Sequence, residues 1–124
     1  MHDQPSVTEL VQAVKNFIEE TAAPNLTGHA AFHARVASNA LATVLRDLEQ
    51  RPEAEPAERE RLLDLLGGSD DQTTGELNQA LSAGIKAGEL TSETPGLLSH
   101  LKATTIAQVE IDQPRYSGLK TAKA

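Results

Sequence analysis

The 124-residue sequence contains no cysteine. This absence excludes a disulfide framework, a thiolate nucleophile, and zinc or iron–sulfur sites with cysteine ligands. Tryptophan is also absent, and Phe17, Phe32 and Tyr116 are the only aromatic residues. The sequence therefore lacks the stacking platforms of single-strand nucleic-acid binders and the aromatic walls of many cofactor pockets. A reducing compartment suits this composition, and we expect a cytoplasmic protein.

Basic charge and long apolar runs are also scarce. The sequence has 11 Lys and Arg against 18 Asp and Glu, so its net charge of −7 opposes non-specific binding to nucleic acid or anionic lipid. No run approaches the ~20 apolar residues of a membrane span. The N-terminal MHDQPSVTEL has no signal-peptide pattern. We expect one domain, residues 1–124, that binds neither nucleic acid nor membranes.

The sequence instead carries helix signals. Ser6 and Glu9 have the spacing of a capping box, and the apolar residues that follow recur at helical spacing to about Thr21. The block 29–50 places a broad apolar surface on one side of a second helix. Repeated alternating strand patterns are absent. These observations predict an all-α fold.

Turn and cap residues predict the remaining elements. The segment 51–56, with two prolines, predicts an acidic connector in which Pro56 enters a third helix that ends at Gly67. A fourth helix should run over about 74–87, with Gly88 as its left-handed cap. Thr94 and Pro95 are typical of the start of a fifth helix. We therefore expect a compact bundle of about five helices with an irregular tail from about residue 112.

A polar stripe flanks the apolar surface of the second predicted helix. It consists of Arg35, Asn39, Thr43, Arg46 and Gln50. The two arginines suit a carboxylate or phosphate, because a planar guanidinium can donate two parallel charged hydrogen bonds, and Asn39 could add a third contact. Alternatively, such residues bond neighbouring helix ends or pair with acids.

His33 falls near the middle of the same apolar surface. An imidazole among apolar neighbours is a candidate acid or base, and the alternative is a structural, hydrogen-bonded histidine. His29 and His33 have the spacing that lets two imidazoles reach one metal, but the glutamate of the HExxH motif and a third ligand are missing. We predict no metal site, no cofactor and no assembled catalytic group.

Four segments occur here in order: HDQPSVTELVQAVKNFIEE, AFHARVASNALATVLRDLE, LNQALSAGIKAGEL and QPRYSG. Together they resemble a small bacterial domain family of unknown function over nearly the whole chain. Members of that family typically end in an Asn-Pro-Arg-Tyr phrase, and Gln113 stands here in place of the Asn. The matching positions are Phe32, His33, Arg35, Val36, Asn39, Arg46, Glu49, Pro114, Arg115 and Tyr116.

The resemblance implies a compact helical protein, often encoded near or fused to aminoglycoside-phosphotransferase-like kinases and near acyl-CoA dehydrogenases. It implies no catalytic role for the matching residues. Our leading hypothesis is a non-catalytic accessory or protein-interaction module for such a kinase or dehydrogenase, with an ordered Arg115 and Tyr116 near Arg35 and Asn39 as the contact. Alternatively, this tail simply closes the bundle.

Two other functions stay open. A small anionic or acyl-thioester ligand could bind between helices, with Arg35, Arg46 and Arg115 for the charge and the aliphatic interior for the chain. An enzyme is the weaker alternative, with His33 as the base and Asn39 or Tyr116 as its hydrogen-bond partner. A homodimer that buries aliphatic stripes is a further candidate assembly. The predicted site residues are His33, Arg35, Asn39, Arg46, Arg115 and Tyr116.

Overall fold

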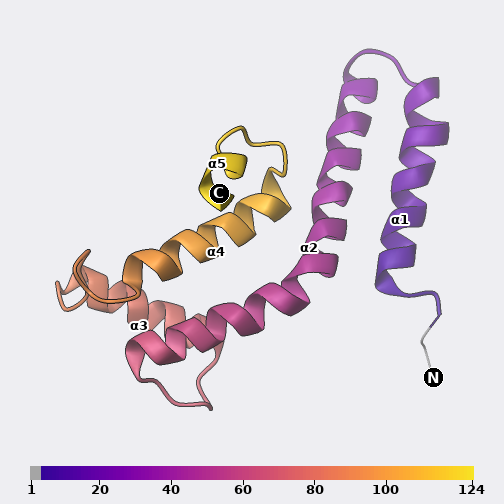
Figure 1. The fold of residues 1–124 in the computed structure, drawn as a ribbon. Helices are drawn as coiled ribbons and strands as arrows, with labels where there is room; N and C mark the ends of the chain where they lie inside the picture. Colours follow the sequence, from indigo (N-terminus) through magenta and orange to yellow (C-terminus); the bar gives the residue numbers. More distant parts are fainter. Residues whose placement is uncertain (1–3) are drawn as a thin grey trace. The chain divides into compact units, whose positions relative to one another are not determined.

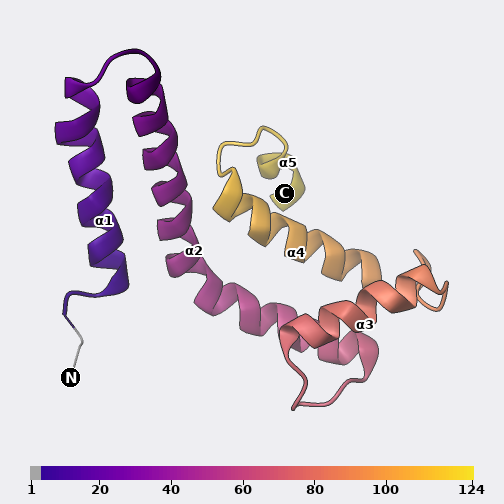
Figure 2. The ribbon, with the colours of Figure 1, turned by 180° about the vertical axis from the view of Figure 1, so that it is seen from behind.

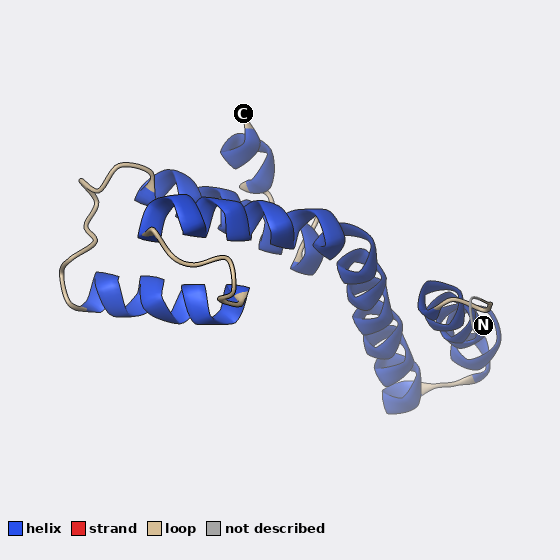
Figure 3. Cartoon of the chain, turned by 90° about the horizontal axis from the view of Figure 1, so that it is seen from below, coloured by secondary structure: helices blue, strands red, loops and turns tan. Residues whose placement is uncertain are grey.

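A computed structural model describes residues 4–124. The regular structure of this range is helical throughout, with five α-helices, one π-helical turn, one 3-10 turn and no strand (Figures 1 and 3). The all-α prediction is confirmed. None of the described helices combines the length and hydrophobicity that a membrane span needs. Residues 1–3, which begin the segment inspected for a signal peptide, lie outside the described range.

The chain divides into two compact units, Met1–Arg51 and Pro52–Ala124. The long helix α2 (Gly28–Leu66) contributes its residues 28–51 to the first unit and 52–66 to the second. Each unit has its own packing and is described separately below. The single domain remains a prediction.

The first unit begins with α1 (Val7–Phe17). Ser6 caps this helix as predicted, since its Oγ accepts a hydrogen bond from the Glu9 N–H at 3.1 Å. The Glu9 carboxylate bonds the Ser6 hydroxyl, at 3.1 Å, and not the Ser6 backbone N–H of a full capping box. The helical path then continues through the π-helical Ile18–Ala22 and the 3-10 turn Ala23–Asn25. The helix predicted to run to about residue 21 is therefore α-helical to Phe17 and π-helical after it.

Helix α1 and the first part of α2 run side by side as a helical hairpin (Figures 1 and 2). Half-buried Val11 and Lys15 of α1 share one side with half-buried Ile18 of the π-helical turn, while α2 supplies half-buried Ala34 and buried Ser38. Such small residues allow two helix backbones to lie close together. The contact between the helices thus uses only a narrow strip of each.

The predicted connector at residues 51–56 is wrong, because α2 continues without a break through Pro52 and Pro56. Each proline removes one backbone N–H from the helix ladder. Helix-favouring neighbours compensate locally. Arg51 Nε and Nη2 donate to Asp47 Oδ1 at 2.9 and 2.6 Å, which forms an i, i+4 ion pair just before Pro52.

The second unit is built around a leucine core. Helix α3 (Thr74–Lys86) and helix α4 (Leu97–Asp112) pack with the end of α2. The buried core consists of Leu62, Leu77, Leu81 and Leu97. Leu63, Leu65, Leu66 and Leu90 pack partly buried against it. One methyl-rich cluster therefore joins three helices and the connection between the last two.

Caps define the ends of these helices. Thr73 and Glu76 form a complete capping box at α3, and Gly88 has a φ of 77° at its far end, as predicted for a left-handed cap. The predicted start at Thr94 is wrong, because α4 begins at Leu97 after Gly96, whose φ is 87°. Thr94 instead accepts a hydrogen bond from the Thr91 N–H at 2.9 Å through its Oγ1.

The tail is only partly irregular. After residues 113–118 the chain forms the short helix α5 (Leu119–Lys123), which contacts α4. Lys123 of α5 forms an ion pair with Glu110 of α4. A backbone hydrogen bond of 3.1 Å from the Leu119 N–H to the Tyr116 carbonyl begins this final turn. The prediction of an irregular tail is therefore wrong for residues 119–123, which are helical.

Candidate functional site

The polar stripe lies on α2 within the first unit, and the structure shows how it is held. Arg46 Nη2 donates to Thr43 Oγ1 at 3.1 Å, and the Thr43 hydroxyl donates to the Asn39 carbonyl at 3.2 Å. These bonds run along one helix and hold Arg46 against its own backbone. Arg35 and Asn39 are exposed. Thr43, Arg46 and Gln50 are half-buried. The role of the polar stripe in ligand binding remains a prediction.

The predicted apolar surroundings of His33 are wrong, because His33 is exposed on α2. Its ring meets the ring of Phe32 edge to face, with centroids 5.6 Å apart and an interplanar angle of 70°. The broad apolar surface expected of residues 29–50 is split, since Phe32, Val36 and Val44 are exposed whereas Leu41 and Leu48 are half-buried. His33 belongs to the exposed part of this surface.

Ser38 is the buried polar residue of the first unit, at 5% exposure. Its hydroxyl donates to Glu19 Oε1 at 2.5 Å, and the same oxygen accepts a bond from Lys15 Nζ at 2.6 Å. The Lys15 ammonium, and after it the Ser38 hydroxyl, hold the pKa of the Glu19 carboxyl below its usual value. This network ties the π-helical turn to α2. The sequence gives one signal for it, a serine among the alanines that face α1.

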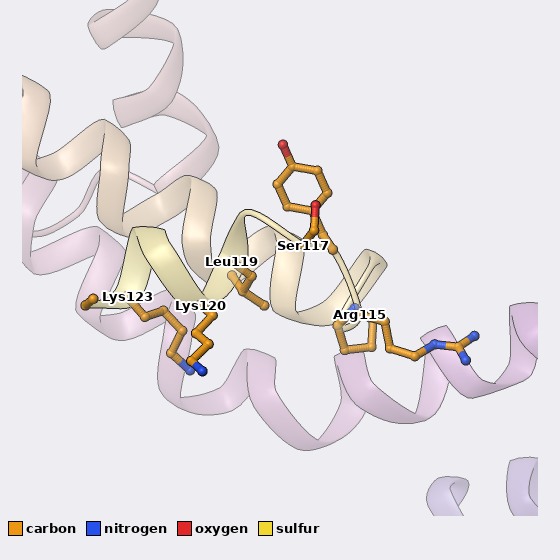
Figure 4. Close-up of a pocket in the computed structure, with 8 residues that line it drawn as sticks. Arg115, Ser117, Leu119, Lys120 and Lys123 are labelled. Atoms are coloured by element: carbon orange, nitrogen blue, oxygen red, sulfur yellow. The ribbon is translucent and has the colours of Figure 1, made fainter.

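Arg115 and Tyr116 line an open hollow in the tail of the second unit, with a volume of about 590 Å³. The other lining residues are Pro114, Ser117, Leu119, Lys120, Lys123 and Ala124. Figure 4 shows the side chains of Lys120 and Lys123 close together, whereas Arg115 extends away from them. The Tyr116 ring lies over Gly118, where an added Cβ would come within 2.7 Å of Cε1. The tail is thus folded locally, with cations pointing in more than one direction.

The six predicted site residues belong to different units. His33, Arg35, Asn39 and Arg46 lie in the first, and Arg115 and Tyr116 lie in the second. A single patch that joins them remains a prediction.

Residues 4–124 contain no group of three or more His, Asp or Glu side chains placed to hold one metal ion. The buried histidine of this range is His100, at 2% exposure, and not His33. Sequence inspection missed His100 because it lies between Ser99 and Leu101 in a helix that has apolar residues on several sides. Arg61 and His100 line a second cavity of about 250 Å³ within the second unit.

Residues 24–116 match the family described as Domain of unknown function (DUF6285). The chain belongs to this family. The DUF6285 match spans all of α2, α3 and α4 and includes the six predicted site residues. Helix α1 precedes the matched region, and α5 follows it. No curated protein and no solved structure matches the chain.

Proposed function

We propose that this DUF6285 protein is a non-catalytic module that docks on a partner protein through the first unit. The observation that supports this function is an apolar stripe on α1. Val7, Leu10, Val14 and Phe17 recur at helical spacing, and each is more than half exposed. A helix that belonged only to the hairpin would need apolar residues only toward α2.

The stripe lies on a different side of α1 from the contact with α2. With successive residues 100° apart, half-buried Val11, Lys15 and Ile18 form the side that meets α2. The stripe is centred roughly 80° around the helix from that side. Its exposure is therefore a consequence of where α1 packs, and rotamer changes of the four side chains would not bury them.

Helix α2 adds further apolar surface to the first unit. Phe32, Val36 and Val44 are each about half exposed. These three residues lie inside the region matched to DUF6285, whereas the α1 stripe lies outside it. A partner that covers both helices would thus contact residues inside the matched region and residues of the N-terminal helix that precedes it.

The size of the stripe fits an interaction surface. Its four side chains expose on the order of 400 Å² of apolar area, in the size range of functional patches on soluble proteins. Burial of this area is worth about 10 kcal/mol before the cost of association, which is of similar size. The stripe alone therefore gives weak binding, and a stable complex requires the apolar residues of α2 as well.

The resemblance described above points to the class of partner, an aminoglycoside-phosphotransferase-like small-molecule kinase or an acyl-CoA dehydrogenase. Affinity purification of the tagged protein from its own host, followed by mass spectrometry, tests this proposal. We expect one such enzyme at near-equal amount. Recovery of the protein without a partner at that stoichiometry would contradict docking.

The tail hollow favours one alternative function, a binder of a small anionic or acyl-thioester ligand. Arg115, Lys120 and Lys123 supply cations there, although Lys123 already pairs with Glu110. For this function, Arg115→Gln should weaken binding of a short acyl-thioester in calorimetric titration and leave the unfolding transition in place. Equal binding by both proteins would remove Arg115 from such a site.

A further inference from the structure

A second cavity lies wholly within the second unit, between α2 and the start of α4. Its volume is about 250 Å³, enough for a small organic acid. Helix α2 contributes Arg61, Asp64 and Leu65, and the chain around the start of α4 contributes Pro95, Gly96, Ser99 and His100. The cavity lies inside the matched region 24–116. It shares no residue with the polar stripe of α2, the apolar stripe of α1 or the tail hollow.

His100 shows that this cavity is not a simple packing gap. The side chain is 2% exposed, and among residues 4–124 its Nδ1 has no hydrogen-bond partner. Burial, with a smaller contribution from the Arg61 charge and an opposing one from Glu58, lowers the pKa of the imidazole. A buried polar nitrogen without a partner costs about 1–3 kcal/mol. A molecule bound beside it would remove that cost.

Arg61, on α2, also has a buried nitrogen without a hydrogen-bond partner in the described part of the chain. Its Nη2 donates to Thr104 Oγ1 at 3.3 Å, while its buried Nε finds no partner within the described residues. The bond to Thr104 orients this guanidinium, but in the same range it leaves the Nε–H donor without an acceptor. Its remaining donors suit an oxyanion, because a carboxylate or phosphate can accept two parallel hydrogen bonds from one guanidinium.

The start of α4 adds donors of the same kind. Gly96 occupies the N-cap position, and no side chain caps this 16-residue helix. The first backbone N–H groups of a helix have no acceptor within it, and they form the positive end of the helix dipole. Ser99, on the first turn of the helix, also lines the cavity. The Nδ1 of His100 and the Nε of Arg61, both unpartnered among residues 4–124, thus belong to residues that line the same cavity as the N-terminus of α4.

We propose that this cavity binds a small, singly charged oxyanion such as a carboxylate. Arg61 and the N-terminus of α4 hold its charge, Ser99 donates one hydrogen bond, and His100 lies against it. Asp64 in the cavity wall opposes a second negative charge. This charge limit favours a monocarboxylate over a phosphate dianion. The proposal does not depend on docking through the first unit.

Nuclear magnetic resonance titration with sodium acetate tests the site on the full chain. We expect saturable shifts of the Leu98 and Ser99 amides and of the His100 ring, with an affinity on the order of millimolar for so small a probe. Sodium chloride at equal ionic strength should give no saturable shift. Inorganic phosphate at pH 8, mostly a dianion, should bind more weakly. Absence of saturation with acetate, or tighter binding of phosphate, would overturn the proposal.

Two variants with matched controls locate the binding. Arg61→Gln should weaken acetate binding at least about tenfold, since it removes a charged donor. Ser99→Ala should weaken it about threefold and keeps the helix intact if Arg61→Gln does not fold. Lys102→Gln and Ser82→Ala change exposed side chains of α4 and α3, and they should bind acetate as the wild type does. Equal binding by Ser99→Ala and Ser82→Ala would contradict the site.

Discussion

Ser38 and Glu19 join the two helices of the first unit by a hydrogen bond of 2.5 Å from a buried hydroxyl to a carboxylate. The residues are separated by 19 positions, and the bond connects α2 to the π-helical turn after α1. Lys15 adds an ion pair of 2.6 Å to the same carboxylate oxygen. The hairpin is therefore held by a polar network as well as by small apolar side chains.

Ser38→Ala should destabilise the first unit, because it removes the hydroxyl that Glu19 accepts from. We expect a lower urea midpoint than for Ser82→Ala, which changes an exposed serine of α3.

Acid should also destabilise the first unit, since the pKa of Glu19 is lowered in the folded state. Its stabilising contribution is present above the usual pKa of 4.5 and is lost as the pH falls through the lower folded value. A Glu19→Gln protein with unchanged acid sensitivity would contradict this assignment.

Leu77→Ala should destabilise the second unit by about 2–5 kcal/mol, because it leaves a cavity in the leucine core. Leu77 is fully buried there. Leu98→Ala is the control, since Leu98 is an exposed leucine of α4 and its truncation should change the free energy of unfolding by less than about 0.5 kcal/mol. Urea unfolding of the two variants measures both values. Similar losses would show that the core lies elsewhere.

His100 should make the second unit sensitive to mild acid. Its folded pKa lies below the ordinary 6.5, so protons bind the unfolded state more readily. Stability is therefore full above about pH 6.5 and falls as the pH drops toward the folded pKa. Arg61 opposes the charge of a protonated His100, and Glu58 favours it.

The free energy of unfolding, measured from pH 7.5 to pH 5, should fall less steeply for His100→Gln than for the wild type. His33→Gln is the matched control, since His33 is exposed on α2, and it should keep the wild-type slope. If the slope vanished in His33→Gln and not in His100→Gln, the acid sensitivity would belong to the first unit, and the prediction for His100 would be contradicted.

Two glycines of the second unit should respond oppositely to alanine. Gly88 has a φ of 77°, a conformation that alanine adopts at a cost of about 1 kcal/mol. Gly75 lies in the first turn of α3, and the nearest atom to an added Cβ is 3.8 Å away. Gly75→Ala should be neutral or stabilising by up to about 1 kcal/mol. Thermal unfolding would contradict this account if Gly88→Ala were the more stable protein.

Local signals in the sequence predicted the elements that local chemistry decides. Ser6 and Gly88 could be recognised as caps because a cap requires only a few neighbouring residues. Pro52 and Pro56 misled the prediction, because the loss of two ladder bonds was not enough to end a helix that the i, i+4 pair of Asp47 and Arg51 supports.

The candidate sites depended on packing, which residue spacing alone does not determine. His33 and His100 both lie among apolar residues of a helix, yet the first is exposed and the second is buried. The difference arises from which side of each helix meets a neighbour. The cavity beside Arg61 could not be found from sequence for the same reason, since its two walls come from residues at least thirty positions apart.

Comparison of Val14→Glu with Asn16→Glu in affinity purification from the host tests the docking proposal most directly. Both residues are exposed on α1, and both changes add the same charge, but only Val14 belongs to the apolar stripe. The account predicts at least a tenfold loss of recovered partner for Val14→Glu, because docking would bury an unpaired carboxylate. It predicts wild-type recovery for Asn16→Glu. Equal recovery by the two variants would contradict docking through α1.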